Sequence, residues 1–155
     1  MTARPALLRR AGQSDKAAVE RLLQAQGLPT AGVAEWIGEF WIAEEDGRIV
    51  GSAGLERYGP DALLRSVAVE PARRGGALGA ALVGAVLEAA RAGGVRGVYL
   101  LTTSAEGYFP RFGFERVERA EVPEAVRGSV EFREACPASA VAMRRRFAGG
   151  QTSTP

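Results

Sequence analysis

The stretch LLRSVAVEPARRGGALGA, residues 63–80, decides the fold of this chain. An apolar run leads into a proline, two arginines and a glycine-rich turn, and an Ala/Leu-rich segment follows the turn. The apolar run predicts a strand, and the Ala/Leu-rich segment predicts a helix. The first amides of a helix have no acceptor within it and carry the positive end of the helix dipole. The turn is therefore predicted to bind an anion, such as the diphosphate of a ligand.

The glycines of this turn do not fit two common phosphate-binding motifs. A P-loop has Lys and then Ser or Thr after its last glycine, whereas alanines follow Gly79 here. Gly75, Gly76 and Gly79 also lack the GxGxxG spacing of a dinucleotide-binding turn. Nucleotide hydrolysis and a dinucleotide cofactor are thus disfavoured. A turn that merely reverses the chain remains the alternative to an anion site.

Composition narrows the class of protein. A length of 155 residues suits one domain, and a net charge of +2 does not indicate a nucleic-acid surface. No apolar run is long enough to span a bilayer. The N-terminus lacks the apolar core of a signal peptide. We therefore expect a cytoplasmic protein without nucleic-acid or membrane partners.

The chain has no histidine and a single cysteine, Cys136. The lack of histidine excludes Ser-His-Asp and Cys-His nucleophiles and His-ligated zinc. One cysteine excludes an internal disulfide and a multi-cysteine metal site, so no metal is expected. Cys136 is expected to be a small buried hydrophobe rather than a metalloid ligand. Catalysis must use carboxylates, hydroxyls, amides, arginines or water.

Periodicity and turn residues predict the elements on both sides of the opening stretch. The elements predicted before the turn are a strand at Leu7–Arg9, a helix capped by Ser14 and reaching about Gln26, a helix at Val33–Phe40, a hairpin of Phe40–Glu45 and Arg48–Arg57 turned by Asp46-Gly47, and a strand at Leu63–Val69. The elements predicted after it are a helix with Leu78, Ala81, Leu82, Ala85, Val86 and Ala89 on its apolar face and Gly93-Gly94 at its end, a strand at Val98–Thr102, a short helix at Ala105–Phe112, a strand from Phe114, and a closing strand at Ala140–Met143. Glu124–Phe132 is left open between helix and loop. Gly149–Pro155 is predicted to be a disordered tail after a single α/β domain at 1–148.

Nearly the full length of the chain resembles the GNAT superfamily of acyl-CoA-dependent N-acyltransferases. The family signature Arg/Gln-x-x-Gly-x-Gly/Ala is matched by Arg74–Gly79, with Ala77 where glycine is expected. An alanine is tolerated there if its φ is helical, because the amide is the group that binds. The resemblance implies an α/β (α+β) GNAT fold, with a mixed central sheet of about six to seven strands flanked by helices. It also implies a splay between the strands of Val67 and Val98, and acetyl-CoA as co-substrate.

The resemblance further implies which residues contact the cofactor. Amides from about Arg74 to Ala80 hold the CoA pyrophosphate, and backbone groups of Val67 and Val69 pair with pantetheine as a further strand would. The complete predicted set is Val67, Ala68, Val69, Arg74, Gly75, Gly76, Ala77, Leu78, Gly79, Ala80 and Phe109.

The segment from Tyr99 to Phe114 resembles the other half of an acetyl-CoA site. Many family members have a Tyr four residues before the glycine equivalent to Gly113, where it acts as the acid for the departing thiolate. Phe109 occupies that position here, and Tyr108 precedes it. Tyr108 is the candidate acid, and a half-buried ring with its hydroxyl at water is the alternative. Thr102, by similarity to N-acetylglutamate synthases, is predicted to donate a hydrogen bond to the thiolate or the oxyanion, unless it only fills a strand end.

The general base is not supplied by the matching position. The synthases have a Glu where Leu63 stands here, so we predict Glu56 on the neighbouring strand as the base, with Asp61 as runner-up. Strand alternation places Glu56 on the same face as Gly54 and Tyr58. An exposed glutamate without a catalytic role is the alternative.

Three arginines are candidates for binding a substrate carboxylate. Arg65 lies on a strand expected to be central, where a charge is costly to bury unless it is paired. It either binds the substrate or pairs structurally with Glu56. Arg57 and Arg133 are the further candidates. Pro137 stands where the synthases have an arginine, so a glutamate substrate is not predicted.

The more specific resemblance is to small acetyltransferases associated with bacterial arsenic-resistance gene clusters. LLRSVAV, YLLTTSAEGYF and VPEAVRGSVEF carry it. The predicted activity is acetyl transfer to the amino group of a small amino-acid-like molecule, by direct attack in a ternary complex. A protein or peptide N-acetyltransferase and a non-catalytic acyl-CoA-binding module are the alternatives. The oligomeric state is left open, with a homodimer as one option.

Overall fold

The structure is a computed structural model that describes residues 6–135 and 139–147. The strands are β1 (Leu7–Arg10), β2 (Trp41–Glu45), β3 (Arg48–Tyr58), β4 (Asp61–Val69), β5 (Gly97–Thr102), β6 (Glu115–Val117) and β7 (Val141–Arg146). The α-helices are α1 (Lys16–Ala25), α2 (Val33–Trp36), α3 (Leu78–Ala92) and α4 (Glu124–Arg127). Short turns of helix are η1 (Gln13–Asp15), η2 (Ile37–Glu39), η3 (Pro71–Arg73), η4 (Phe109–Phe112), η5 (Arg119–Glu121) and the π-helical η6 (Glu131–Ala135).

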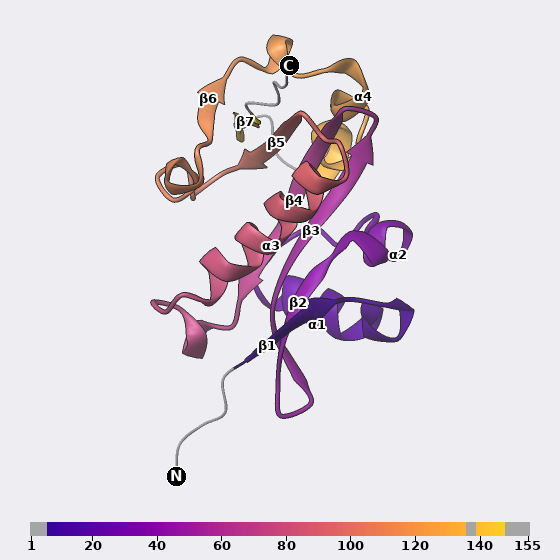
Figure 1. Cartoon of the computed structure of the whole chain (residues 1–155), viewed down its shortest axis with the longest axis vertical. Helices are drawn as coiled ribbons and strands as arrows, with labels where there is room; N and C mark the ends of the chain where they lie inside the picture. The colour runs from indigo at the N-terminus through magenta and orange to yellow at the C-terminus, as the bar shows by residue number, and fades with distance from the viewer. Residues whose placement is uncertain (1–5, 136–138, 148–155) are drawn as a thin grey trace. The chain divides into compact units, whose positions relative to one another are not determined.

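These strands form one mixed sheet. Within the described residues it has seven strands in the order β1-β2-β3-β4-β5-β7-β6 (Figure 1). β4 and β5 pair in parallel, whereas the β1–β2, β2–β3, β5–β7 and β6–β7 pairs are antiparallel. The predicted fold class, a mixed sheet flanked by helices, is confirmed.

Contacts along the chain define two compact units. The first contains the residues up to Leu55 together with Arg65–Val86, and the second contains Glu56–Leu64 and the residues from Leu87 onward. β3, β4 and α3 contribute residues to both units. The division of the chain into one domain at 1–148 stays a prediction, and its C-terminal tail lies outside the described residues.

The β2–β3 hairpin of the first unit forms as predicted. Asp46 has φ +52° and Gly47 has φ +76°. Two successive left-handed residues make the turn whose twist matches paired strands, and Asp-Gly is a preferred sequence for it. The register pairs Glu45 with Arg48 on either side of the turn.

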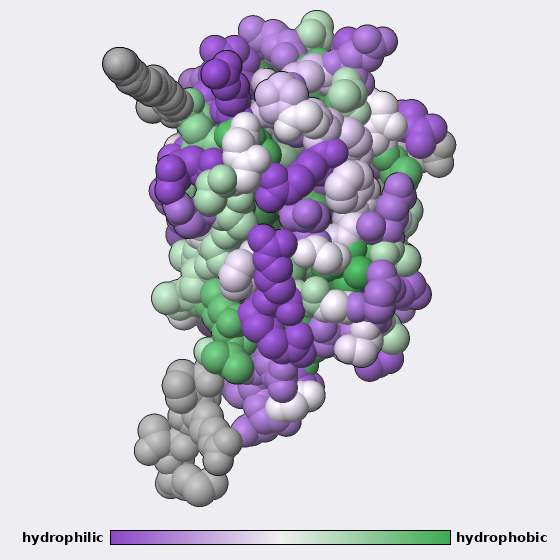
Figure 2. Space-filling view, turned by 45° about the vertical axis from the view of Figure 1, so that its right-hand side comes forward, coloured by the Kyte–Doolittle hydropathy of each residue, from purple (hydrophilic) through white to green (hydrophobic). Residues whose placement is uncertain are grey.

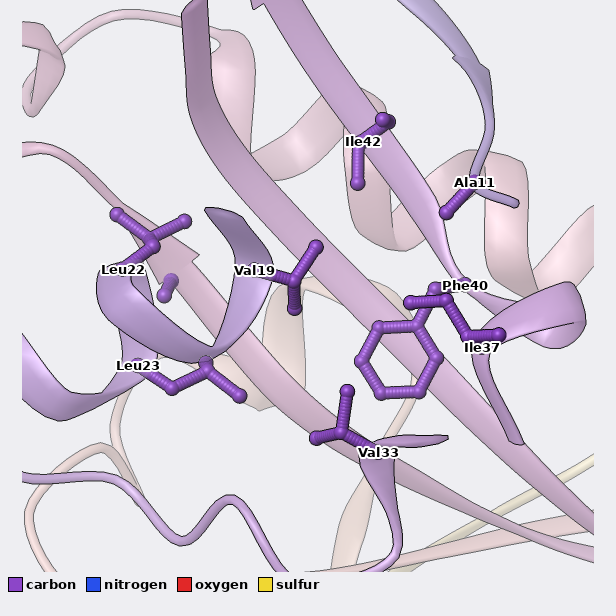
Figure 3. Packing of buried hydrophobic residues seen from close by; sticks show 9 residues of the cluster. Ala11, Val19, Leu22, Leu23, Val33, Ile37, Phe40 and Ile42 are labelled. Carbon is purple, nitrogen blue, oxygen red and sulfur yellow. The ribbon is translucent and has the colours of Figure 1, made fainter. Parts of the chain in front are cut away.

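The core of the first unit lies between α1, α2 and the sheet. Val19, Leu22 and Leu23 of α1 pack with Phe40 and with other buried side chains (Figure 3). The full cluster is Ala11, Val19, Leu22, Leu23, Val33, Ile37, Phe40, Ile42 and Ala68. A Cβ at Gly54 would lie 2.5 Å from the Phe40 ring, so glycine is required beneath that ring. Among the described residues Leu7 is the large hydrophobic side chain left exposed, and the face in Figure 2 mixes hydrophilic and hydrophobic residues.

The predicted start of the first helix was wrong. Ser14 lies inside η1, and Asp15 is the N-cap residue of α1. The Asp15 carboxylate accepts hydrogen bonds from the Gly12 amide at 2.8 Å and from the Arg9 guanidinium at 2.9 and 3.0 Å. Hydrogen bonds from Arg9 hold the pKa of Asp15 below its usual range. The Asp15 carboxylate thus binds Arg9, six positions earlier, and the Gly12 amide before η1, and it makes no capping hydrogen bond to α1.

The core of the second unit lies on one face of β4, β5 and β7. Leu63 pairs with Tyr99, and Tyr99 pairs with Arg144 on the far side of β5. The buried cluster there is Leu63, Tyr99, Val117, Val122, Val126 and Ala142, with Tyr58, Leu101 and Phe132 packed against it. The segment left open in the sequence supplies part of this cluster through α4 and η6.

The buried face of α3 is rotated from the predicted one. Leu82 and Val86 are buried as expected, but Val83, Leu87 and Ala90 join them. Ala81, placed on the apolar face by periodicity, is exposed. Burying the larger Val83 and Leu87 removes more apolar area from water than burying alanines. Gly93 and Gly94 end the helix as predicted, with Gly94 at φ +91°.

Two other boundaries differ from the prediction. The expected helix at Ala105–Phe112 is a turn followed by η4, and Phe109 rather than Ala105 is its first residue. The closing strand extends to Arg146 because Gly97–Thr102 of β5 provides six paired positions. The π-helical η6 has no signal in the local sequence. Cys136 lies outside the described residues.

Two glycines, Gly84 within α3 and Gly93 directly after its end, are expected to respond oppositely to alanine. A Cβ at Gly84 meets nothing within 4 Å, so Gly84→Ala should stabilise the protein by about 0.5–1 kcal/mol through helix propensity. A Cβ at Gly93 would lie 2.5 Å from Arg57 Nη1, whose guanidinium donates to the Ala89 carbonyl. Gly93→Ala should therefore lower the melting temperature. Equal increases for both variants in thermal unfolding would contradict this packing.

Candidate active site

The glycine-rich turn of the first unit joins η3 to α3. Residues 74–77 form the turn, and Gly75 has φ +89°. The Ala81 amide donates to the Ala77 carbonyl at 2.9 Å, which is the first helical hydrogen bond of α3. The amides of Leu78, Gly79 and Ala80 therefore precede the first helical donor and lie at the positive end of a 15-residue helix.

The two arginines before the turn have different surroundings. Arg73 forms a bidentate ion pair with Glu45 of the hairpin, in which Nε lies 3.0 Å from Oε2. Arg74 is exposed, and its Nε donates to the Val69 carbonyl at 3.2 Å. Arg73 thus attaches η3 to the hairpin, and Arg74 is the arginine at the surface beside the turn.

The turn has room for close approach of a ligand. A Cβ at Gly75 would meet nothing within 4 Å, and one at Gly76 would meet only the Arg73 carbonyl, at 3.8 Å. Positive φ explains glycine at 75, but packing does not explain glycine at 76. Among the described non-glycine residues, positive φ occurs at Asp46 and Ser66, so Ala77 does not need a glycine conformation. The open backbone fits an approaching phosphate.

The strand before the turn exposes alternate residues. Val67 and Val69 are half-buried, and Ala68 between them is 3 % exposed. The Val69 carbonyl accepts hydrogen bonds from Gln26 Nε2 at 2.8 Å and from Arg74 Nε at 3.2 Å. A carbonyl oxygen has two lone pairs, and these two donors occupy both. A pantetheine group would therefore either bind the Val69 amide or displace Arg74 from the Val69 carbonyl.

Ser66 interrupts β4 with φ +58°, a conformation that is uncommon outside glycine. Its carbonyl accepts from Ser52 Oγ at 2.7 Å, and its hydroxyl accepts from Arg65 Nε at 2.9 Å. No local sequence pattern predicts this strained residue. It lies directly before Val67, the first predicted contact with pantetheine, and changes the regular pleat at that point.

Arg65 is 2 % exposed. Besides the contact with Ser66, its Nη2 donates to the Pro29 carbonyl at 3.3 Å, and its guanidinium lies 6.0 Å from the centre of the Phe40 ring. These contacts attach β4 to the segment after α1. They favour a positioning role for Arg65, and the predicted contact with a substrate carboxylate stays a prediction.

In the second unit, Glu56 lies near the end of β3 and is 2 % exposed. The predicted alternative of an exposed glutamate is therefore wrong. The Tyr58 hydroxyl donates to Glu56 Oε1, as expected for residues two apart on one face of a strand. Tyr58 was not predicted as a functional residue, although strand alternation places it beside Glu56. Burial raises the pKa of the runner-up Asp61, and Arg146 opposes the rise.

Thr102 is the last residue of β5 and is half-buried. Its Oγ1 accepts a hydrogen bond from the Ala105 amide at 2.9 Å, which fixes the side chain at the strand end. A threonine hydroxyl that accepts in this way can still donate its own proton. The geometry is compatible with the predicted hydrogen bond to a thiolate or an oxyanion.

The aromatic residues around η4 form a cluster. Tyr108 is half-buried, and its ring packs edge-on against Phe109 and Phe112 with centroids 5.2 and 5.3 Å apart. The Arg111 guanidinium lies 4.4 Å from the centre of the Tyr108 ring. Phe109 is 7 % exposed and also contacts Phe114. The roles of Tyr108 as acid and Phe109 as cofactor contact stay predictions.

The other two predicted substrate residues lie apart along the chain. Arg57 is half-buried and donates to the Ala89 carbonyl at 3.5 Å, near the C-terminal end of α3, where a cation is favourable. Arg133 is exposed on η6, and its Nε donates to the Gly128 carbonyl at 2.8 Å. Both guanidinium groups bind backbone carbonyls, which the sequence could not reveal.

Two other kinds of site find no support in the described residues. No three His, Cys, Asp or Glu side chains there are grouped as metal ligands would be. No helix in the same residues has the length and apolar character needed to cross a membrane.

Comparison with known proteins identifies the family. Residues 36–116 match the acetyltransferase (GNAT) domain. The amino-acid acetyltransferase of Mycobacterium tuberculosis is 34 % identical over 142 residues, which span 81 % of this chain and 80 % of the relative. The chain belongs to the GNAT acetyltransferase family and is an acetyl-CoA-dependent N-acetyltransferase.

Solved structures share this fold. A Mycobacterium tuberculosis protein in complex with CoA has a TM-score of 0.77 and 27 % identity, with 91 % of this chain and 99 % of that chain covered. N-acetylglutamate synthase from Neisseria gonorrhoeae, in complex with CoA and N-acetyl-glutamate, has a TM-score of 0.79 and 23 % identity. The match covers 94 % of this chain but only 36 % of the synthase, and it shows the fold alone.

Proposed function

We propose that this acetyltransferase acts on the amino group of a small amino-acid-like molecule, which attacks acetyl-CoA directly in a ternary complex. The observation that carries the proposal is the 34 % identity with an amino-acid acetyltransferase over about four-fifths of both chains. A match of that extent spans both the glycine-rich turn and β5, rather than the CoA-binding signature alone.

The first unit supplies the proposed CoA contacts. The amides around Leu78–Ala80 bind the pyrophosphate, and Gly76 lets it approach the backbone. Arg74 moves from the Val69 carbonyl to the phosphate, since a guanidinium binds an anionic phosphate more strongly than it binds a neutral carbonyl. The Val69 carbonyl is then available to pantetheine, as the Val67 and Val69 pairing requires.

The second unit supplies the proposed chemistry. Glu56 takes the proton of the amine, and the amine nitrogen forms a bond to the acetyl carbon. Thr102 donates a hydrogen bond to the developing oxyanion. The carbon–sulfur bond then breaks, and the CoA thiolate receives a proton from Tyr108 or from water. The chain has no histidine, so it cannot form the Cys-His or Ser-His pair that a covalent route would use. Direct attack by the amine needs no such nucleophile.

The substrate carboxylate is assigned to one of the three candidate arginines. Arg133 is the exposed member of the three candidate arginines, so we assign it the substrate carboxylate and assign positioning roles to Arg57 and Arg65. We also propose that the chain acts as a single domain in the cytoplasm.

A substrate panel tests the proposed function. Acetyl-CoA is incubated with free amino acids, with their phosphono- and arsono-analogues, and with peptides that carry the same N-terminal residue, and release of the CoA thiol is followed. We expect turnover of at least one free amino acid or analogue and much slower turnover of the matched peptides. Turnover confined to peptides would favour a protein N-acetyltransferase and contradict the proposal.

A further inference from the structure

We propose that Tyr58 is a catalytic residue that relays the proton of the substrate amine to Glu56. This inference rests on the proposed function and deepens it, because it names the route by which the base is reached. Tyr58 matches no position of the family signature quoted above.

The burial of the two side chains points to a relay. Glu56 is 2 % exposed, so its carboxylate is almost out of reach of an incoming molecule. Tyr58 is half-buried, and its hydroxyl donates to Glu56 Oε1. Its ring packs against the cluster of Leu63 and Tyr99, which fixes its position. The phenol hydroxyl thus links the buried carboxylate to a side chain that is itself only half-buried.

The cost of burying Glu56 makes a purely passive role less favourable. A buried carboxylate is expensive unless it is hydrogen-bonded, and an apolar residue of similar size would avoid the cost. The pair lies on an 11-residue strand, which holds it more firmly than a loop would.

The proton transfer balances without any further reactant. The substrate ammonium first passes one proton to Tyr58 Oη, directly or through one water, and the phenolic proton passes at the same time to Glu56 Oε1. The neutral amine then attacks the acetyl carbon and the carbon–sulfur bond breaks, and the nitrogen releases a second proton while the thiolate takes one up from Tyr108 or water. Tyr58 therefore ends neutral, Glu56 ends protonated, and CoA leaves as the thiol. Because both transfers occur together, no free tyrosinate forms.

The pH dependence of Tyr58→Phe tests the relay. Loss of the hydroxyl should lower kcat/KM by about 10²-fold near pH 7, the range typical of one acid–base group. The deficit should shrink as the pH rises and the amine loses its proton to solvent before binding. A merely structural role of the hydroxyl would lower activity by the same factor at every pH.

Tyr99→Phe is the matched control, because it removes a phenol hydroxyl from the same cluster and Tyr99 is assigned no step of the reaction. Its pH profile should equal that of the wild type. Glu56→Asp, which draws the carboxylate away from Tyr58, should resemble Tyr58→Phe. Stabilisation by acetyl-CoA in thermal unfolding should persist in every variant. If the wild type is active and Tyr58→Phe keeps its pH profile, the relay alone is overturned; if the wild type acetylates no amine, both proposals fail.

Discussion

Gly76→Glu is expected to abolish acetyl-CoA binding while the chain stays folded. A side chain at 76 meets only the Arg73 carbonyl, at 3.8 Å, so the variant is not expected to strain the turn. Its carboxylate would lie where the pyrophosphate is proposed to bind. Like charges brought together cost several kcal/mol, and each 1.4 kcal/mol is tenfold in affinity. We expect a loss on the order of 10²-fold or more.

Thermal unfolding with and without acetyl-CoA measures this loss, because a ligand that binds only the folded state raises its stability. Gly76→Gln has nearly the same size without the charge and should retain more affinity. Gly84→Glu places the same charge on the open side of α3 and should bind as the wild type does. Undiminished stabilisation of Gly76→Glu by acetyl-CoA would show that the pyrophosphate site is misplaced.

Glu56→Gln is expected to reduce turnover by about 10²- to 10⁴-fold, the usual contribution of a general base. Glutamine keeps the shape of the side chain, and its carbonyl can still accept the Tyr58 hydrogen bond. It cannot take up a proton, so the amine must lose its proton to solvent. Binding of acetyl-CoA should be unchanged. Steady-state turnover and thermal unfolding with acetyl-CoA measure the two effects separately.

Glu131→Gln is the control for this substitution, because Glu131 is another buried carboxylate of the second unit, 5 % exposed and assigned no part in the reaction. It should change stability rather than the pH dependence of turnover. Turnover by Glu56→Gln at the wild-type rate would exclude Glu56 as the base. Asp61, whose pKa is raised by burial, would then be the next candidate for the base.

Local signals in the sequence were sufficient for much of the fold. Asp46-Gly47 predicted the hairpin because few sequences favour two left-handed residues in succession. The glycine-rich stretch predicted the turn and the start of α3, and Gly93-Gly94 predicted its end. The alternation of Val67, Ala68 and Val69 also matches the observed burial.

The remaining features depend on contacts between distant residues. The hydrogen bond from Gln26 to the Val69 carbonyl spans 43 positions. The positive φ of Ser66 is supported by Ser52 on another strand, so no local pattern predicts it. Strand alternation could have predicted that Glu56 and Tyr58 lie on one face and can form a hydrogen bond. It could not have predicted that Glu56 is buried.

Simultaneous detection of both products tests the central claim most directly. The wild-type protein is incubated with isotopically labelled acetyl-CoA and an amino acid that the panel identifies, and free CoA and the labelled product are quantified together. We predict equal amounts of free CoA and of an amino acid acetylated on its amino nitrogen. Release of CoA without an N-acetylated product, or no release with any amino acid or analogue, would contradict the proposed activity.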